Sequence, residues 1–252
     1  MLNVKNLTVK RSGRDVLNDI TFKASNGNWL MLAGPNGAGK TTLIGAISQS
    51  LPYLGEIEIA GKNAAFVPRK KIAGFIGVLE QTNYVNYPFS VYEIVSLGRY
   101  SYQTGFFKVL NAEDMEKIDT ALNAVGMYHL KERSILTLSG GELRRAFLAQ
   151  VIAQDPQIII LDEPANNLDL QYQKQIFELI SKWIEDTGRL CITAVHDLNL
   201  ARAFGTHALL LQGGKLFGYG KAHEILTGNN LADVYSMDVN AWFEFLNDAW
   251  RK

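Results

Sequence analysis

One short segment, residues 34–41, constrains the fold of this 252-residue chain more than any other. An apolar run at 29–33 precedes this glycine-rich segment and predicts a buried strand, and residues 42–48 predict a helix. A strand, a glycine-rich turn and a helix N-terminus together form a nest of backbone N–H groups that receives an anion. Glycines permit positive φ and a close approach to phosphates. The predicted phosphate cradle consists of Gly34, Pro35, Asn36, Gly37, Ala38, Gly39, Lys40, Thr41 and Thr42.

Two residues of the cradle carry specific chemistry. Lys40 can reach the β- and γ-phosphates of a bound nucleotide, and the Thr41 hydroxyl can ligate Mg²⁺. A glycine turn that simply connects a strand to a helix is the structural alternative. The apolar strand directly before the turn favours the phosphate cradle.

A second apolar run, residues 158–161, ends in Asp162, Glu163 and Pro164. Such a run is typical of a central parallel strand that is buried on both faces. In an open α/β sheet, residues at the carboxyl end of such a strand face the ligand crevice. We therefore expect Asp162 to hold Mg²⁺ through water and Glu163 to polarise the water that attacks the γ-phosphate. A surface pair of acidic residues is the alternative for this pair taken alone.

The segment Leu-Ser-Gly-Gly-Glu at residues 138–142 opens a third informative region. Apolar residues recur after it at helical spacing, and Pro156 ends the pattern. Ser139 is a favoured N-cap residue, while Gly140 and Gly141 leave the first N–H groups of the helix open to an anion. Taken alone, the segment equally fits a well-capped helix without a ligand.

These motifs resemble, over nearly the whole chain, those of the ATP-binding cassette (ABC) ATPases. Residues 34–41 match the Walker A motif, 158–162 match Walker B, and 138–142 match the family signature, with Glu142 where Gln is commonest. The resemblance implies an α/β fold: a P-loop NTPase (RecA-like) core with a parallel sheet, an antiparallel β subdomain and a helical subdomain. It also implies one domain over residues 1–252, with the helical subdomain inserted at about residues 83–154.

Three further positions receive roles from this resemblance. Gln81 matches the Q-loop glutamine that senses Mg²⁺ and the permease, residues 166–169 resemble the D-loop, and His196 matches the switch histidine. His196 could then bond the γ-phosphate or the attacking water without acting as the base. Each position also has a structural explanation: a polar strand end for Gln81, a helix cap for Asp169 and a surface histidine for His196.

The sequence departs from the family pattern at three more positions. Arg11 stands where an aromatic residue commonly stacks on adenine, and a guanidinium can also stack on a π-face. A solvated basic turn is the alternative for Arg11. Ala165 and Asn166 occupy positions where Thr, and Ser or Thr, are common. Neither of these two departures is expected to remove hydrolysis.

The resemblance further implies how the activity works. ATP and Mg²⁺ are the expected cofactors, and ATP closes a homodimer in which each signature covers the nucleotide on the other copy's Lys40 loop. The expected partners are a second copy of the chain, a multi-span permease and a substrate-binding protein that acts through it. The expected location is peripheral, at the cytoplasmic face of the inner membrane.

Residues 88–100 bear on the transported substrate. They resemble a pattern in importers of iron-siderophore, haem and cobalamin chelates, although an amphipathic helix with a glycine stop fits equally. An importer of another small solute and an exporter are the alternatives. No heptad run interrupts residues 42–138, which disfavours a chromosome-maintenance ATPase. The residues expected near the permease are Asn83, Tyr84, Tyr87 and Phe89.

Composition limits the remaining possibilities. Twenty-five basic residues balance twenty-five acidic ones, so no overall field favours a nucleic-acid partner. The single cysteine, Cys191, excludes an internal disulfide and suits a reducing compartment. The first residues show no basic-then-apolar pattern, so we expect no leader, and no apolar run approaches the roughly 18 residues of a membrane span. We expect a soluble chain whose membrane role comes from its partners.

Periodicity and turn residues also predict elements outside the motifs. The expected strands are residues 2–9, 20–22, 54–59, 190–195 and 209–212. The expected helices are residues 90–97, 112–125, 172–183, 222–226 and 242–250, besides the helix that follows the signature.

Overall fold

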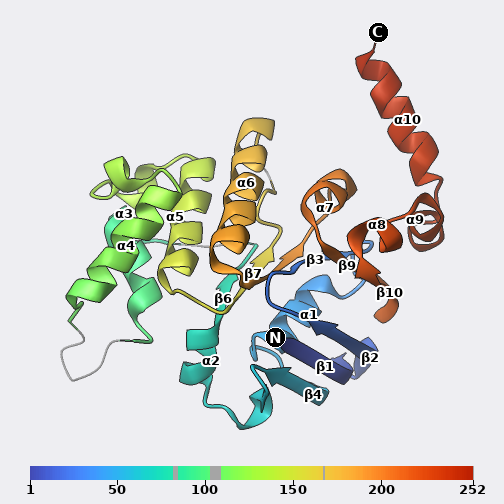
Figure 1. Ribbon diagram of the computed structural model, residues 1–252, viewed down its shortest axis with the longest axis horizontal. Helices are drawn as coiled ribbons and strands as arrows, with labels where there is room; N and C mark the ends of the chain where they lie inside the picture. Colours follow the sequence, from blue (N-terminus) through green and yellow to red (C-terminus); the bar gives the residue numbers. More distant parts are fainter. Residues whose placement is uncertain (82–84, 103–108, 167, 252) are drawn as a thin grey trace. The chain divides into compact units, whose positions relative to one another are not determined.

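The computed structural model describes residues 1–81, 85–102, 109–166 and 168–251 (Figure 1). The chain divides into two compact units. The first comprises Met1–Ala65 and Ala194–Lys252, and the second comprises Phe66–Thr193.

An antiparallel sheet forms one part of the first unit. Its strand order is β2 (Arg14–Ala24), β1 (Leu2–Arg11), β4 (Leu54–Ile59) and β5 (Lys62–Asn63). Buried residues alternate with partly buried ones along most of β1, as expected for a strand with one face on the core. Asn6, with φ of 49°, lies within a shift of the β1–β2 register between Val4 and Leu7. This irregularity keeps Val4 and Leu7, three residues apart, both buried.

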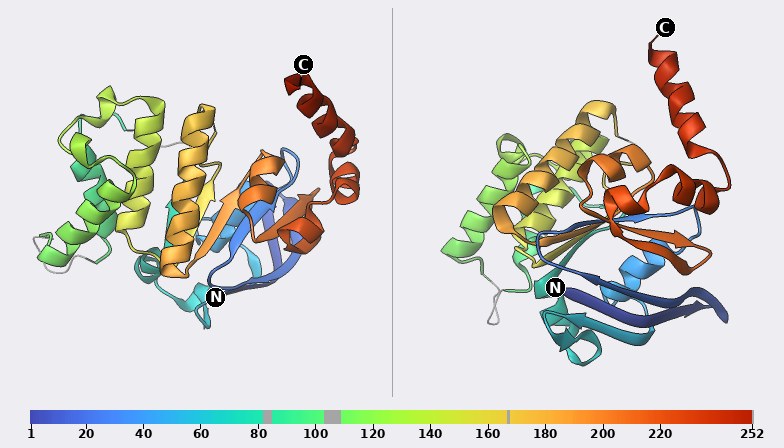
Figure 2. Two further views of the ribbon diagram at one scale, coloured as in Figure 1. Left: turned by 45° about the horizontal axis from the view of Figure 1, so that its top comes forward. Right: turned by 45° about the vertical axis from the view of Figure 1, so that its right-hand side comes forward.

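The other strands of the first unit include β3 (Trp29–Ala33), which leads into the predicted phosphate cradle. β3 is buried throughout and runs parallel to β9 (His207–Gln212), which pairs antiparallel with β10 (Lys215–Lys221). Helix α1 (Lys40–Ile47) follows β3 after the glycine-rich loop. The later helices are α7 (Leu198–Phe204), α8 (Ala222–Ile225), α9 (Gly228–Tyr235) and α10 (Val239–Trp250). Figure 2 shows α10 leading away from α9.

The second unit has its own parallel strands. β6 (Ile76–Leu79) and β7 (Ile158–Asp162) are parallel, with Leu79 opposite Leu161, and β8 (Leu190–Ala194) lies next to β7. Helix α2 (Arg69–Phe75) precedes β6, and α6 (Leu170–Thr187) connects β7 to β8. Cys191 is fully buried in β8, and this burial raises the pKa of its thiol to about 12. The strand expected at residues 190–195 is therefore present, and it ends at Ala194.

Helices form the rest of the second unit. α3 (Val91–Ser96), α4 (Ala112–Ala124) and α5 (Gly140–Ala153) lie side by side in Figures 1 and 2. A buried ion pair joins the short helix at residues 97–99 to α4, because Arg99 Nε donates to Asp114 Oδ1 over 2.8 Å. Arg99 Nη1 also donates to the carbonyl oxygen of Ala153 at the end of α5, over 3.1 Å. Short 3₁₀ helices are η1 (Ala64–Phe66), η2 (Leu97–Arg99), η3 (Tyr128–Leu130) and η4 (Ile135–Thr137).

Most of the expected elements are present. The strands expected at 29–33 and 54–59 have the same bounds in the structure, while the helix expected at 172–183 is longer and begins at Leu170. The helix after the cradle begins at Lys40, two residues before the expected start. No sequence pattern predicted α2, α7, α9 or β10. Arg11 is the last residue of β1 rather than part of the following turn.

Asp155 offers a test of electrostatic stabilisation in the second unit. Lys117 Nζ donates to its carboxylate over 2.8 Å, and Arg189 Nη1 also donates to it. Burial tends to raise the pKa of Asp155, but the hydrogen bonds from Lys117 and Arg189 outweigh burial and lower the pKa below its usual value of 3.8. Because the folded-state pKa is depressed, the stabilisation is present above pH 3.8 and is lost as the pH falls through the folded-state value.

We therefore expect Asp155→Asn to reduce the free energy of unfolding by about 1 kcal/mol at pH 7. Asn also tolerates the positive φ of 54° at this position, so the substitution should add no backbone strain. Urea unfolding of both proteins from pH 7 down to pH 3 measures the difference. The difference should narrow below about pH 4, and a constant difference over the whole range would contradict the assignment.

Candidate functional site

The glycine-rich loop between β3 and α1 has the backbone conformation that the sequence predicts. Gly34, Gly37 and Gly39 have φ values of 143°, 78° and 106°, which L side chains rarely adopt. A Cβ atom at Gly34 would lie 2.3 Å from the carbonyl oxygen of Leu211, and one at Gly39 would lie 2.5 Å from Leu17 Cδ2. Glycine is therefore required at position 34 by both its backbone conformation and the nearby carbonyl, and at position 39 mainly by its backbone conformation.

The side chains of the loop differ in burial and in their contacts. Lys40, at the start of α1, is buried, and its Nζ donates to the carbonyl oxygens of Gly34 and Pro35 over 2.7 and 3.2 Å. The ammonium group therefore lies against the backbone of the loop. Thr41 is exposed, so its hydroxyl is accessible, whereas Thr42 is buried. Asn36 is exposed as well.

Tyr235 supports the loop from a distant part of the sequence. The backbone N–H of Gly34 donates to the Tyr235 hydroxyl over 3.1 Å, from α9. Burial raises the pKa of Tyr235 above its usual value, so this hydroxyl stays protonated at neutral pH. Sequence reasoning missed this residue, because no local pattern connects positions 201 residues apart.

His196 and Arg11 also belong to the first unit. His196 follows β8 and is exposed, while the next residue, Asp197, caps α7 by accepting from the backbone N–H groups of Asn199 and Leu200. Arg11 is exposed at the end of β1, opposite Arg14 in the hairpin. Their roles at a nucleotide stay predictions.

The carboxyl ends of β6 and β7 bring two candidate residues together in the second unit. Gln81 Nε2 donates to Glu163 Oε2 over 2.7 Å, and Asn166 Nδ2 donates to the same oxygen over 2.8 Å. Asp162 is the last residue of β7 and is buried, while Glu163 is half-buried. Sequence reasoning placed Gln81 and Glu163 at strand ends, and the parallel register explains why they meet.

The chemistry of the expected metal ligands fits Mg²⁺. The hydroxyl of Thr41, the amide oxygen of Gln81 and the carboxylate of Asp162 are all oxygen donors, which this ion prefers. Within the described ranges, no group of three or more His, Cys, Asp and Glu residues could hold a metal ion. A donor set with one carboxylate fits an ion that takes its other ligands from phosphates and water.

Helix α5, which starts within residues 138–142, begins with a capping box. The N–H of Glu142 donates to Ser139 Oγ over 3.3 Å, and the N–H of Ser139 donates to the Glu142 carboxylate over 2.7 Å. The bond from the Ser139 backbone is the main reason that the pKa of Glu142 lies below its usual value. Glu and Gln both serve at this box position, so Glu142 keeps the local structure that the motif requires. A Cβ at Gly140 would meet open space, so the start of α5 is uncrowded there.

Comparison with known proteins decides the family. A family model described as ABC transporter matches residues 17–166, a span that contains the glycine-rich loop, the capped helix and the β7 carboxylates. The chain belongs to the ABC transporter family. It is an ATP-hydrolysing cassette of this family.

Relatives of the cassette match it over almost their full length. It is 32% identical to the petrobactin import ATP-binding protein YclP of Bacillus subtilis (strain 168), over 95% of this chain and 94% of that one. It is 36% identical to the hemin import ATP-binding protein HmuV of Pseudomonas fluorescens, with the same coverage. It is 33% identical to the ferric enterobactin transport ATP-binding protein FepC of Escherichia coli (strain K12), over 94% and 87%.

A solved structure supports the same fold. An inward-facing metal-chelate type ABC transporter superposes with a TM-score of 0.83 at 26% identity, over 94% of this chain and 89% of that one. The expected α/β fold, a P-loop NTPase with antiparallel β and helical parts, is thereby confirmed. In the described part of the cassette, no helix combines the length and the apolar character that crossing a membrane demands.

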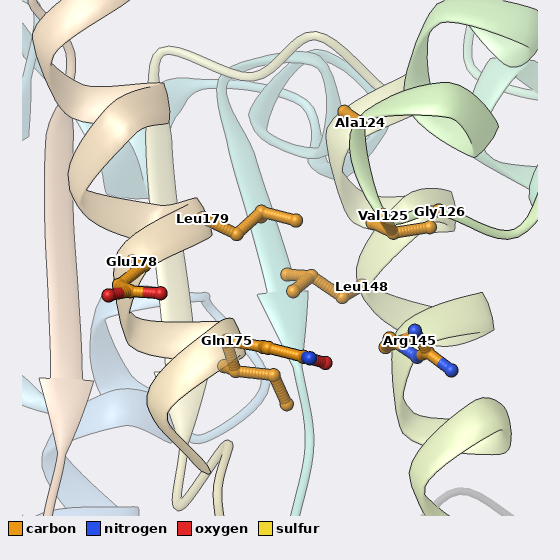
Figure 3. Close-up of a pocket in the computed structure, with 9 residues that line it drawn as sticks. Ala124, Val125, Gly126, Arg145, Leu148, Gln175, Glu178 and Leu179 are labelled. Carbon is orange, nitrogen blue, oxygen red and sulfur yellow. The ribbon is translucent and has the colours of Figure 1, made fainter. Parts of the chain in front are cut away.

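Two adjacent arginines of α5 contact different surroundings. Arg145 lines a cleft of about 330 Å³ between the end of α4, α5 and α6 (Figure 3). Its guanidinium lies 5.1 Å from the centre of the Tyr172 ring. Arg144 instead donates hydrogen bonds to backbone carbonyls at the ends of β6 and β7. Sequence reasoning gave neither arginine a role.

Of the residues expected near a permease, Tyr87 and Phe89 are exposed, and their ring centres lie 6.1 Å apart. Asn83 and Tyr84 lie outside the described residues, as does Asn167 of the D-loop.

Proposed function

We propose that this ABC ATPase powers a membrane importer for a metal chelate of the iron-siderophore, haem or cobalamin type. The observation that carries the proposal is similarity over more than 90% of the cassette to import ATP-binding proteins for petrobactin and hemin, and to a transport ATP-binding protein for ferric enterobactin. The resemblance of residues 88–100 to a chelate-importer pattern supports the same cargo. The cassette would act at the cytoplasmic face of the inner membrane as a peripheral subunit.

In this proposal the glycine-rich loop binds the phosphates of ATP, with Lys40 at the β- and γ-phosphates. Thr41, Gln81 and Asp162 would hold Mg²⁺, which neutralises phosphate charge when bound. Glu163 polarises the attacking water, and His196 hydrogen-bonds the γ-phosphate or that water. The hydrogen bond between Gln81 and Glu163 supports the proposal, because it connects the expected sensor directly to the expected base.

We further propose that two copies act head to tail. Ser139, Gly140 and Gly141 of one copy would cover the ATP bound at the Lys40 loop of the other, and loss of phosphate after hydrolysis would reopen the dimer. The open space at Gly140 supports this arrangement, since an anion can approach the first turn of α5 there. The exposed Tyr87 and Phe89 would contact the permease, through which a substrate-binding protein delivers the cargo.

Uptake in the source cell tests the cargo. Cells that lack this cassette should lose accumulation of one labelled chelate among a ferric siderophore, hemin and cobalamin. The intact gene should restore uptake, whereas a copy with Glu163→Gln should not. Normal uptake of all three chelates in the deletion strain would contradict the proposed cargo and favour an importer of another solute, or an exporter.

A further inference from the structure

The turn that presents Glu163 has a rarely adopted backbone conformation. Glu163 has φ of 50°, in the left-handed region, although it carries a full side chain. Such a conformation persists only where the surrounding structure holds it. The question is therefore which group in the second unit holds this turn.

Arg144 of α5 contacts both sides of the turn. Its Nη2 donates to the carbonyl oxygens of Asp162 and Glu163 over 2.9 and 3.1 Å, and its Nε donates to that of Pro164 over 3.1 Å. Three consecutive carbonyls are thus fixed by one planar group. Arginine suits this task because its guanidinium presents five donors in a rigid arrangement.

The same guanidinium also reaches the segment that carries Gln81. Arg144 Nη1 donates to the carbonyl oxygens of Glu80 and Gln81 over 2.5 and 3.3 Å. Among the described residues, Arg144 therefore donates to five backbone carbonyls, at the ends of both β6 and β7. The side-chain bond between Gln81 and Glu163 lies between the two segments that Arg144 connects.

The charge of Arg144 strengthens this connection. The guanidinium of an arginine is cationic at neutral pH. Hydrogen bonds from a cation to carbonyl oxygens are stronger than those between neutral groups. A lysine at this position would keep the charge but could not reproduce the planar set of donors.

We propose that Arg144 is a positioning residue for ATP hydrolysis, which holds the Glu163 turn and ties it to the Gln81 segment through the backbone carbonyls. This inference rests on the proposed roles of Glu163 and Gln81. Arg144 touches neither phosphate nor water in this scheme. Its effect is to keep the carboxylate where the attacking water would be polarised.

The test compares three variants of the full chain by steady-state ATP hydrolysis and thermal unfolding. Arg144→Met removes the donors and keeps much of the stem, while Arg144→Lys keeps the charge. Arg189→Met is the matched control, since Arg189 also bonds a backbone carbonyl, that of Pro156, and the Asp155 carboxylate. These bonds lie at the amino ends of β7 and β8, whereas Arg144 bonds the carboxyl ends of β6 and β7.

We expect Arg144→Met to lower kcat roughly 10- to 100-fold, because small displacements of a catalytic group cost about this much. The KM for ATP should change less than twofold, and Arg144→Lys should give an intermediate kcat. Arg189→Met should lower Tm with kcat unchanged. Should Arg144→Met fail to fold, Arg144→Lys tests the proposal instead, and a fall in its kcat at constant KM would support it.

Two results would overturn the inference: a kcat within twofold of the parent, or a loss that appears in KM alone. Glu163→Gln, measured alongside, separates this failure from that of the proposed function. If Arg144→Met is active while Glu163→Gln is inactive, only the proposed role of Arg144 is contradicted. An active Glu163→Gln removes the proposed role of Glu163 itself.

Discussion

Replacing Glu163 with Gln is expected to slow ATP hydrolysis by about 10²- to 10⁴-fold, the range for loss of a general base. Glutamine has the same shape and can still accept hydrogen bonds from Gln81 and Asn166, so the local structure should persist. ATP binding should be retained, because the glycine-rich loop is unchanged. Steady-state hydrolysis and nucleotide binding on the same preparation check both expectations.

Mixing two inactive variants tests whether each site is shared, with the Lys40 loop from one copy and Ser139 from the other. In a head-to-tail dimer, a Glu163→Gln copy supplies an intact Ser139 to a Ser139→Arg copy, whose own Lys40 loop and Glu163 are intact. The mixture, combined before ATP is added, should therefore regain hydrolysis that neither variant shows alone. A mixture as inactive as its components would count against the shared site, and full activity of Ser139→Arg alone would exclude it.

Asp114→Ala is expected to reduce the free energy of unfolding by about 3–5 kcal/mol. Arg99 and Asp114 are 4% and 3% exposed, so removal of the carboxylate leaves a buried guanidinium without its charged partner. Asp114 also completes the capping box of α4 by accepting from the N–H of Asn111. The loss of both interactions should destabilise the helical part of the second unit.

Urea unfolding followed by far-ultraviolet circular dichroism measures this effect. Glu113→Ala is the matched control, because Glu113 lies in the same helical turn but is exposed. Arg99→Met combined with Asp114→Leu should regain part of the stability, since it removes both buried charges. If Asp114→Ala lost no more stability than Glu113→Ala, the buried pair would not stabilise the fold.

The sequence predicted the site motifs well because their chemistry is local. The positive φ of Gly34 and the cap at Ser139 both follow from residues within a few positions. The role of Arg144 was not predicted, because its acceptors are backbone carbonyls up to 64 residues away. Every residue has a backbone carbonyl, so such acceptors leave no pattern in the sequence. The contact of Tyr235 with Gly34 was missed because it joins a side-chain hydroxyl to a backbone N–H group 201 residues away.

Some elements were missed because their signals are weak. Asp197 and Thr227 cap α7 and α9, but these helices have only seven and eight residues, too few for a clear apolar period. β10 contains Gly218 and Gly220, which lower its strand propensity. Pairing with β9 forms the strand nevertheless. Contacts with other parts of the fold, rather than local sequence signals, therefore stabilise these elements.

The burial of Cys191 has a practical consequence for distance measurements. A thiol with a pKa of about 12 forms almost no thiolate at neutral pH and reacts slowly with maleimides. Because the chain has one cysteine, a second one placed on an exposed residue would take up a spin label or fluorophore selectively. Separations between labelled copies could then be followed through the nucleotide cycle while the native sequence is otherwise kept.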